Sequence, residues 1–536
     1  MDERERDSLT RRQLTRRHLL RTGTLAAGGA VAAGLAARGT VGAAPVAPGR
    51  TRRTTHQSAG TLTIGQPAPF QFMDPQRTYL SSESSTHQSI FDTLVSFDDS
   101  AQFRPLLATE WSSTGPTEWT FKLRQGVTFH NGEVFNAEVV RWNVERITEP
   151  GFQDFAFMAP VDHAEVVDEY TIKIVTKKTH PTLPNLMSQF FIVSPQAMAN
   201  GVDEFVKQPI GTGPYKFVDW VPDDHVRVEA NESYWGGAPT IKEVVWRVMP
   251  EASTRVAALQ AGEIQVLKDL PSDQYDIVDE ADGIRATEVR SVRTPYLRFF
   301  PDSPQGGGEP FKDKRVRQAF NYAINIDSII TNLLGGHAER MATTMTPEMF
   351  GYDPAIQPYA YDLEKAKQLM TEAGFADGFE ITFETWSAGP APKPVELAQA
   401  VAADLAKINV KATVKPVELG TALKAQVDKT ISPFGLWSWG GNGFDGDTKF
   451  WGIYHTDSSS TFMTDQTMID LIEAEQATTV PEERKAIFSQ LQQHAVEEAF
   501  IVPLFAQMDT YGVSDSVTWT ARHDELVLPY YMTLTS

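Results

Sequence analysis

Residues 119–140 constrain the fold more than any other part of this sequence. The first five of them alternate between apolar and polar side chains, which is the pattern of a strand with one buried face. The alternation resumes at Val127 and Phe129, and the Asn-Gly pair that follows tolerates positive φ and favours a turn. Asn136 can then cap a helix by accepting a hydrogen bond from a free backbone N–H. The stretch therefore predicts strand, turn, strand and helix, an order that occurs in many α/β domains.

Three more segments accompany this stretch, at residues 105–111 (P-L-L-A-T-E-W), 211–215 (G-T-G-P-Y) and 310–325. Together with W-x-F-x-L-R-x-G-V-x-F-x-N-G-x-x-F-x-A-x-x-V they resemble the family 5 extracellular solute-binding proteins. These are the peptide- and nickel-binding receptors of ABC importers. The resemblance extends from Thr61 to the C-terminus.

The chain has 536 residues, which is too long for a single core, and strand patterns alternate with helical ones. We therefore expect an α/β protein. The resemblance implies the two-lobe periplasmic-binding-protein fold of type II, similar to cluster C, with an extra domain inserted in the first lobe. The implied ranges are 61–97, 208–295 and 504–536 for lobe I, 98–207 for the inserted domain and 296–503 for lobe II. Such receptors close around a ligand by a hinge motion.

The N-terminal residues have the pattern of an export signal. The pair Arg16-Arg17 precedes an apolar run at residues 22–37, which is too short for a permanent membrane span. Small residues ending at Ala43 provide a cleavage site, so residues 1–43 are predicted to be a twin-arginine signal peptide. The alternatives are a disordered basic tail or a short anchor. Residues 44–60 are expected to be a disordered linker.

The composition limits the partners. There is no cysteine, which excludes disulfides, thiolate metal sites and a lipid-bearing cysteine. The net charge of −21 disfavours nucleic acid. We expect an exported monomer in the periplasm or at the outer face of the cytoplasmic membrane. Its partners would be a ligand, the membrane subunits of an ABC importer and, during export, the twin-arginine translocase.

The candidate ligand-binding segment runs from Trp439 to Asp447. It resembles the family's W-x-x-D-x-x-D-P-D segment, which follows a strand and lines the ligand cleft. In peptide-binding members, the first acid of that segment pairs with the α-ammonium of the ligand. Here this position is Asn442, whereas the next acid is kept as Asp445 and the usual proline is Gly446.

Aromatic residues are expected beside this segment. Trp437 and Trp439 occupy positions i and i+2 of the predicted strand, so both face the same side and could form a stacking wall for a ligand. The alternative is that one or both belong to the core. Tyr79 completes the predicted ligand-binding set.

The ligand class stays open at this stage. An asparagine cannot form the charge-assisted bond to an ammonium group. A peptide could instead be held by Asp445 or have a blocked N-terminus, and an oligosaccharide or another uncharged solute could use the amide as both donor and acceptor. A peptide is the first choice because of the family.

Two enzymatic alternatives have little support. An exported hydrolase needs a nucleophile or an acid–base pair, and neither G-x-S-x-G nor H-E-x-x-H occurs. The second alternative is a dinucleotide-dependent oxidoreductase. Residues 441–446 fit the dinucleotide-binding pattern G-x-G-x-x-G, with Asp465 near the spacing of a ribose-binding acid, but no compact βαβ unit surrounds them. We therefore expect no catalytic residue, no metal and no cofactor.

Overall fold

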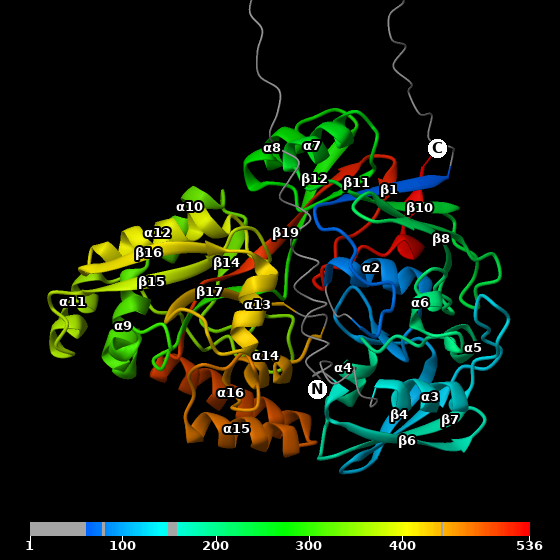
Figure 1. Cartoon of the computed structure of the whole chain (residues 1–536), viewed down its shortest axis with the longest axis horizontal. Helices are drawn as coiled ribbons and strands as arrows, with labels where there is room; N and C mark the ends of the chain where they lie inside the picture. The colour runs from blue at the N-terminus through cyan, green and yellow to red at the C-terminus, as the bar shows by residue number, and fades with distance from the viewer. Residues whose placement is uncertain (1–59, 78–80, 148–157, 441–442, 536) are drawn as a thin grey trace, which may run out of the picture. The chain divides into compact units, whose positions relative to one another are not determined.

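The computed structural model describes residues 60–77, 81–147, 158–440 and 443–535 (Figure 1). The predicted signal peptide and all but the last residue of the predicted linker lie outside these ranges. The described chain is built on three large sheets. We call the part on the eight-stranded sheet lobe I, the part on the four-stranded sheet the inserted domain and the part on the five-stranded sheet lobe II.

The sheet of lobe I has the order β12-β19-β11-β1-β10-β9-β8, with β14 paired to β19. β1 runs parallel to both of its neighbours, and its Leu62 and Ile64 side chains are completely buried, as expected for a central parallel strand. The strands are β1 (Thr61–Gln66), β8 (Tyr215–Val221), β9 (His225–Ala230), β10 (Glu243–Val248), β11 (Val266–Lys268), β12 (Ile284–Arg290), β14 (Ala338–Arg340) and β19 (Phe505–Ser514).

Helices and two small sheets complete lobe I. The helices are α2 (Ser81–Ile90), α5 (Pro195–Met198), α6 (Val202–Phe205), α7 (Ala252–Gln260), α8 (Tyr275–Asp279), η2 (Ser272–Gln274) and η4 (Pro529–Tyr531). The small sheets pair β2 (Val95–Phe97) with β3 (Phe103–Pro105) and β20 (Val517–Thr518) with β21 (Thr533–Leu534).

The inserted domain contains the stretch that opened the sequence analysis. Its antiparallel sheet has the order β4-β5-β7-β6, and α3 lies beside it (Figure 1). The elements are β4 (Ala108–Gly115), β5 (Glu118–Leu123), β6 (Val161–Asp168), β7 (Thr171–Thr176), α3 (Ala137–Ile147) and α4 (Leu183–Met187).

The predicted first strand, turn and helix of that stretch are confirmed. β5 forms as predicted, Gly132 has φ +87° in the turn, and the Asn136 side chain accepts from Val139 N at 3.1 Å to cap α3. The predicted second strand at Val127 and Phe129 is wrong, because only a single bridge joins Thr128 to Val134. Nearby backbone groups bond elsewhere, for example His130 N to Gly211 O at 2.9 Å, so no ladder develops.

Lobe II has a five-stranded sheet in the order β16-β15-β17-β13-β18. The aromatic rings of Phe299, Phe311, Phe320 and Phe434 meet in its core, with centroids 4.7–5.9 Å apart. Phe320 belongs to the family-like segment at residues 310–325, most of which forms α9 and buries its apolar face. The strands are β13 (Thr294–Phe299), β15 (Phe379–Trp386), β16 (Val410–Val417), β17 (Phe434–Trp439) and β18 (Ile501–Pro503).

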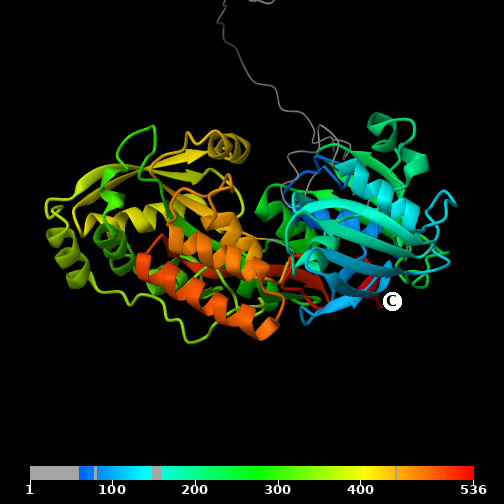
Figure 2. The same ribbon diagram turned by 90° about the horizontal axis from the view of Figure 1, so that it is seen from below.

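The helices of lobe II cover this sheet and extend from it. α15 and α16 lie side by side in both views (Figures 1 and 2). The helices are η3 (Glu309–Lys312), α9 (Lys314–Ala323), α10 (Ile326–Leu333), α11 (Leu363–Glu372), α12 (Pro394–Ala406), α13 (Leu419–Val427), α14 (Asp447–Tyr454), α15 (Gln466–Ala477) and α16 (Pro481–Glu498).

Apart from β14, a short strand between α10 and α11 that pairs with β19 of lobe I, the chain passes between the lobes at two neighbouring places. It leaves β12 of lobe I for β13 of lobe II, and it returns from β18 to β19. The two passages are hydrogen-bonded to each other, from Ser291 N to Gln507 O at 2.9 Å and from Gln507 N to Arg293 O at 3.3 Å. A paired two-strand connection of this kind permits bending at the pair while each lobe keeps its own core.

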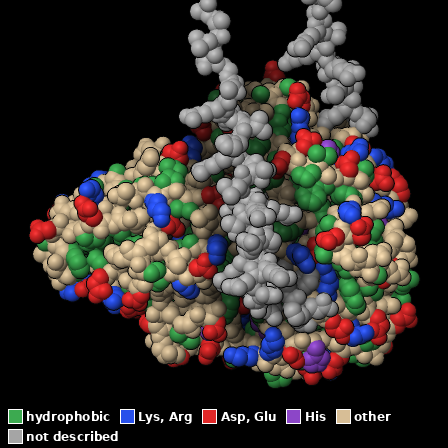
Figure 3. Space-filling view, viewed as in Figure 1, with side chains coloured by type: hydrophobic (Ala, Val, Ile, Leu, Met, Phe, Trp, Pro, Cys, Tyr) green, Lys and Arg blue, Asp and Glu red, His purple; other side chains and the backbone are tan. Residues whose placement is uncertain are grey.

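The surface carries charges of both signs. On the face shown in Figure 3, acidic and basic side chains are interspersed over the described residues of both lobes. Many belong to exposed ion pairs, such as Arg141 with Glu138 and Lys424 with Asp428. Exposed pairs of this kind contribute little to stability.

Candidate functional site

The segment between β17 and α14 lies where lobe II meets the rest of the chain. The ring of Phe444 meets that of Phe97 edge to face, with centroids 4.9 Å apart. A Cβ added to Gly443 would lie 3.6 Å from Gln189 Nε2, in the segment after α4. Two residues of the predicted ligand-binding set, Asn442 and Tyr79, lie outside the described residues, and their role stays a prediction.

Trp437 lies inside lobe II and is only 5% exposed. The guanidinium of Arg298 lies over its ring at 4.2 Å, and the Trp386 ring lies 5.1 Å away. Burial lowers the pKa of Arg298 to about 10, although the nearby Glu384 carboxylate acts in the opposite direction. These contacts give Trp437 a packing role, and its predicted contact with a ligand stays a prediction.

Trp439, two residues further along β17, is half-buried. Its ring lies directly over the backbone of Gly452 in α14, because a Cβ added to Gly452 would lie 2.2 Å from Trp439 Cη2. A glycine inside a helix is otherwise unfavourable, so this contact explains its presence. The ring thereby sets the distance between β17 and α14, the two elements that hold the candidate segment.

Asp445 is buried and engaged by an arginine of α16. Arg484 donates two hydrogen bonds of 2.6 Å to the two oxygens of Asp445, and a third of 2.9 Å to Glu475. Burial by itself lowers the pKa of Arg484, but the charge and hydrogen bonds of Asp445, together with the charges of Glu475 and Asp447, raise that pKa above its ordinary value. The Asp445 oxygens therefore already have a charged partner within lobe II.

Asp447 joins lobe II to the inserted domain. Its Oδ2 accepts a 3.1 Å hydrogen bond from Thr182 Oγ1, at the start of α4, and its Oδ1 accepts a 2.7 Å bond from Gln476 of α15. His180 Nε2 lies 3.2 Å from the Thr182 hydroxyl. The backbone oxygen of His180 accepts from Trp119 Nε1 at 3.1 Å, so the stretch at 119–140 also positions this contact.

The carboxyl groups around Asp447 do not share one protonation state. Burial, and then the Asp447 charge, raises the pKa of Glu475 well above its usual range. Burial also acts to raise the pKa of Asp447, but hydrogen bonding from Glu475 and the neighbouring Arg484 hold it below its usual value. These opposite shifts favour the protonated form of Glu475 and the ionised form of Asp447.

Buried charges also hold the passages between the lobes. Arg293 pairs with Glu525 at 2.7 Å and packs so closely on Gly440 that a Cβ there would lie 2.4 Å from the guanidinium carbon. Lys449 of α14 donates to the backbone oxygens of Val292 at 2.5 Å and of Thr344 at 2.6 Å. Burial is the main cause that lowers the pKa of Lys449 well below its usual value. The candidate segment is therefore tied to the hinge at both ends.

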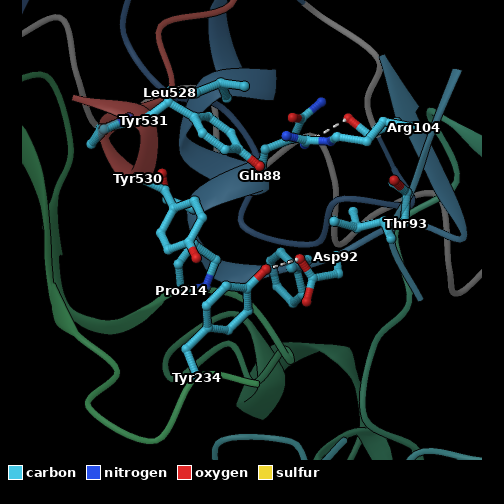
Figure 4. Close-up of a pocket in the computed structure, with 14 residues that line it drawn as sticks. Gln88, Asp92, Thr93, Arg104, Pro214, Tyr234, Leu528, Tyr530 and Tyr531 are labelled. Carbon is cyan, nitrogen blue, oxygen red and sulfur yellow. Dashed lines mark hydrogen bonds between the residues drawn. The ribbon is translucent and has the colours of Figure 1, made fainter. Parts of the chain in front are cut away.

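A recess in lobe I is lined by Asp92 and by residues of two sequence motifs, Leu106 of P-L-L-A-T-E-W and Pro214 of G-T-G-P-Y (Figure 4). Asp92 accepts hydrogen bonds from Tyr234 at 3.1 Å, Trp235 at 2.9 Å and Thr212 of G-T-G-P-Y at 3.0 Å. Burial raises the pKa of Asp92, and these bonds oppose that rise. The carboxylate is fully used by its neighbours, so the motif residues here serve packing within lobe I.

Metal chemistry has no support in the described ranges. No group of three or more His, Cys, Asp or Glu side chains in the described residues could hold a metal ion. Among the same residues, no helix is long and apolar enough to cross a membrane. The junction offers hydrogen bonds and charge instead, which suits non-covalent contact with a solute.

Sequence reasoning missed the partners of the candidate segment. Asp447 was visible as the last acid of the segment, but Thr182 lies 265 positions away and belongs to no recognised motif. Arg484 and Gln476 lie on helices whose patterns indicate only that one face is buried. An unpaired buried acid requires a partner, and that requirement is the only signal that could have suggested them.

Comparisons with known proteins agree with this architecture. The profile described as "Bacterial extracellular solute-binding proteins, family 5 Middle" matches residues 102–461. The glutathione-binding protein GsiB of Pectobacterium atrosepticum is 31% identical over 386 residues, which is 71% of this chain and 73% of the relative. Heme-binding protein A of Haemophilus influenzae is 30% identical over 401 residues, covering 68% and 71%.

Solved structures show the same fold. The periplasmic binding protein DppA from Helicobacter pylori, in complex with the peptide STSA, has a TM-score of 0.78 at 25% identity, covering 89% of this chain and 98% of that one. A dipeptide-binding protein from Pseudoalteromonas sp. SM9913, in complex with Met-Leu, has a TM-score of 0.79 at 23% identity, covering 89% and 100%. The predicted α/β two-lobe fold is therefore confirmed, and this chain belongs to the bacterial extracellular solute-binding proteins of family 5, the receptors of ABC importers.

Proposed function

We propose that this protein captures a short peptide between its lobes by hinge closure and delivers it to the membrane subunits of an ABC importer. The observation that supports this most is the junction itself. The segment after β17 in lobe II faces the inserted domain, and the chain connects the lobes through two paired passages. A solute that contacts both lobes stabilises their closed arrangement, and an importer can recognise closure because the two arrangements differ in affinity for it.

A peptide is the preferred ligand class because of what the relatives bind. Similar proteins are a glutathione-binding protein and two receptors whose structures contain the dipeptide Met-Leu and the peptide STSA. Other relatives are named for heme or contain a nickel–histidine complex, so the family fold alone does not fix the ligand. We therefore place a peptide first and an oligosaccharide or another uncharged solute second.

The anchor for a peptide ammonium differs from the family pattern. The usual acid is replaced by Asn442, and the retained Asp445 already accepts two hydrogen bonds from Arg484. Removing Asp445 from that pair would leave the buried arginine with only its hydrogen bond to Glu475, which is costly. We propose that Asp445 shapes the segment and that Asn442 contacts the ligand through its amide.

Three aromatic residues complete the proposed ligand-binding set: Tyr79, Trp437 and Trp439. The replacement Trp437→Phe separates a ligand contact from packing. Loss of affinity at unchanged unfolding free energy would support a ligand contact. Loss of stability at unchanged affinity would assign Trp437 to the core of lobe II.

Export is proposed to use the twin-arginine route, with removal of residues 1–43 and retention outside the cytoplasmic membrane as a monomer. The basis is Arg16-Arg17 ahead of an apolar run. Replacing both arginines by lysine should abolish export, because the guanidinium pair and not charge alone is recognised. Secreted protein that still begins at Met1 would contradict the cleavage.

Ligand binding without turnover tests the proposed function directly. Native mass spectrometry of the protein as purified would reveal a retained solute. Calorimetry with glutathione, with dipeptides to pentapeptides and with oligosaccharides would rank the classes, and a bound ligand should raise the melting temperature. Cleavage of any of these compounds during incubation would instead establish the hydrolase alternative.

A further inference from the structure

The contact between Thr182 and Asp447 joins parts of the chain that move apart in a hinge-closing receptor. We propose that the Thr182 hydroxyl and the Asp447 carboxylate form a latch that holds the inserted domain against lobe II. This inference rests on the proposed hinge closure and adds a pair of residues that stabilise the closed form independently of the ligand.

The geometry of the latch supports a defined hydrogen bond. Thr182 Oγ1 donates to Asp447 Oδ2 at 3.1 Å, and both side chains are buried. Because the hydroxyl proton points to Asp447, the Thr182 oxygen can accept from His180 Nε2 at 3.2 Å. The latch is therefore a short relay from an imidazole through a hydroxyl to a carboxylate.

Lobe II holds the Asp447 carboxylate ready for this contact. Gln476 donates to its second oxygen at 2.7 Å, and the backbone N–H of Asp447 itself donates to Asp445 Oδ1 at 3.0 Å. Asp445 is fixed in turn by Arg484. Each of these bonds lies within lobe II, so they persist when the lobes separate, and only the Thr182 hydroxyl is then withdrawn.

The burial of the contact determines its strength. A hydrogen bond to a charged group contributes about 1.5–3 kcal/mol, and removing the donor leaves the buried carboxylate short of a partner. The ratio of closed to open molecules should then fall about ten- to hundredfold. Thr182→Val makes that change while it conserves the shape of the side chain.

The lack of cysteine in the chain makes the lobe separation directly measurable. We choose Val167→Cys in β6 and Val427→Cys in α13 for a pair of spin labels, since these side chains are 57% and 63% exposed. Electron–electron double resonance would give the distribution of distances between the inserted domain and lobe II. The measurement uses the ligand-free protein, so it needs no identified ligand.

Thr212→Val is the matched control. Thr212 Oγ1 also donates to a buried aspartate, Asp92 at 3.0 Å, but both residues lie on the lobe I side of the hinge. The variant should therefore lower the unfolding free energy without changing the distance distribution. Circular dichroism of both variants verifies that they are folded.

We expect the distance between the two labels to shift from short in the parent to long in Thr182→Val, and to stay unchanged in Thr212→Val. An unchanged distribution in folded Thr182→Val would overturn the latch, and so would a parent protein that shows only the long distance. Receptor function is tested separately. If peptides bind but Thr182→Val leaves the distance distribution unchanged, the latch alone is refuted. If the distances between the labels do not change with any ligand that calorimetry shows to bind, hinge closure is refuted.

Discussion

Arg484 is the single residue on which the buried charges beside the candidate segment depend. It donates to Asp445 and Glu475, and its guanidinium lies over the Phe350 ring at 5.1 Å. Replacement by methionine keeps much of the volume but leaves Asp445 without its charged partner. We expect Arg484→Met to lower the unfolding free energy by about 3–5 kcal/mol, measured by urea denaturation.

Arg141→Met is the control for this loss. Arg141 also pairs with two acids, Glu138 and Glu145, but on the exposed face of α3. Exposed pairs of this kind contribute about 0–1 kcal/mol, so the control should remain close to the parent. Equal losses in the two variants would mean that burial gives the Arg484 pair no additional strength.

The contact between Trp439 and Gly452 gives a prediction of unusual sign. Glycine to alanine inside a helix normally stabilises by about 0.5–1 kcal/mol. Here the new methyl group would lie 2.2 Å from the indole, so Gly452→Ala should destabilise by about 1–3 kcal/mol and change the tryptophan fluorescence. Gly420→Ala in α13, which meets only the flexible end of Glu418, should be neutral or stabilising. Stabilisation by Gly452→Ala would show that Trp439 can move away.

The position of the candidate segment after β17 followed from its resemblance to a family motif, whereas the ligand contacts expected of its residues stay predictions. The sequence did not reveal the partners of these residues. The ion pair with Arg484 joins residues 39 positions apart on different elements, and no local pattern specifies such a pair. Long-range polar contacts follow from the packing of whole elements, which a periodicity does not determine.

At the scale of elements, strands and helices with a clear period were predictable. Alternation at residues 119–123 gave β5, and helical spacing with an Asn136 cap gave α3. Alternation at Val127 and Phe129 had the same appearance but failed, because Phe129 and Phe135 form backbone bonds to Glu133 and Val127 within a compact turn. A short alternation does not distinguish a strand from a turn that buries two side chains.

The segment before α4 carries a titratable group at the junction. His180 faces Asp447, Asp445 and Arg484 of lobe II, and Glu475 lies behind Asp447. On its own segment, His180 contacts the Thr182 hydroxyl. Burial lowers the pKa of His180, and the Asp447 charge only partly restores it. Separation of the lobes would return the pKa of His180 towards about 6.5.

Protonation of His180 should therefore favour the open form. A group whose pKa is lowered on closure binds its proton preferentially in the open form, so closure weakens as the pH falls through about 6.5. We expect the closed fraction of the spin-labelled protein to drop between pH 7.5 and 5.5, and His180→Gln to reduce that drop. The control is His87→Gln, because His87 is buried within lobe I and also has a lowered pKa. A drop that persists in full in His180→Gln would assign the pH response elsewhere.

At the scale of the whole molecule, the two-lobe fold was predictable because several motifs occur in a fixed order along most of the chain. The ligand is not determined in the same way, since relatives with this fold are named for different solutes. The described carboxylates of the candidate segment already have partners, since Asp445 is paired to Arg484 and Asp447 is bound by Thr182 and Gln476. By the resemblance to the family motif, the usual acid of this segment is replaced by Asn442.

We therefore expect the binding of peptides to depend little on their ammonium group. Acetylation of the N-terminus should change the affinity of a dipeptide to pentapeptide series by less than about tenfold, because the two described carboxylates of the candidate segment, Asp445 and Asp447, already have partners and Asn442 has no charge for a charge-assisted bond. Asn442→Asp should increase affinity for the free peptides and not for the acetylated ones. Asn332→Asp, which adds the same charge on the exposed face of α10, should change neither. Calorimetry on the parent protein and the two variants measures these affinities. Binding that acetylation abolishes and that Asn442→Asp does not improve would mean that another acid holds the ammonium, and that the amide at position 442 does not select the ligand.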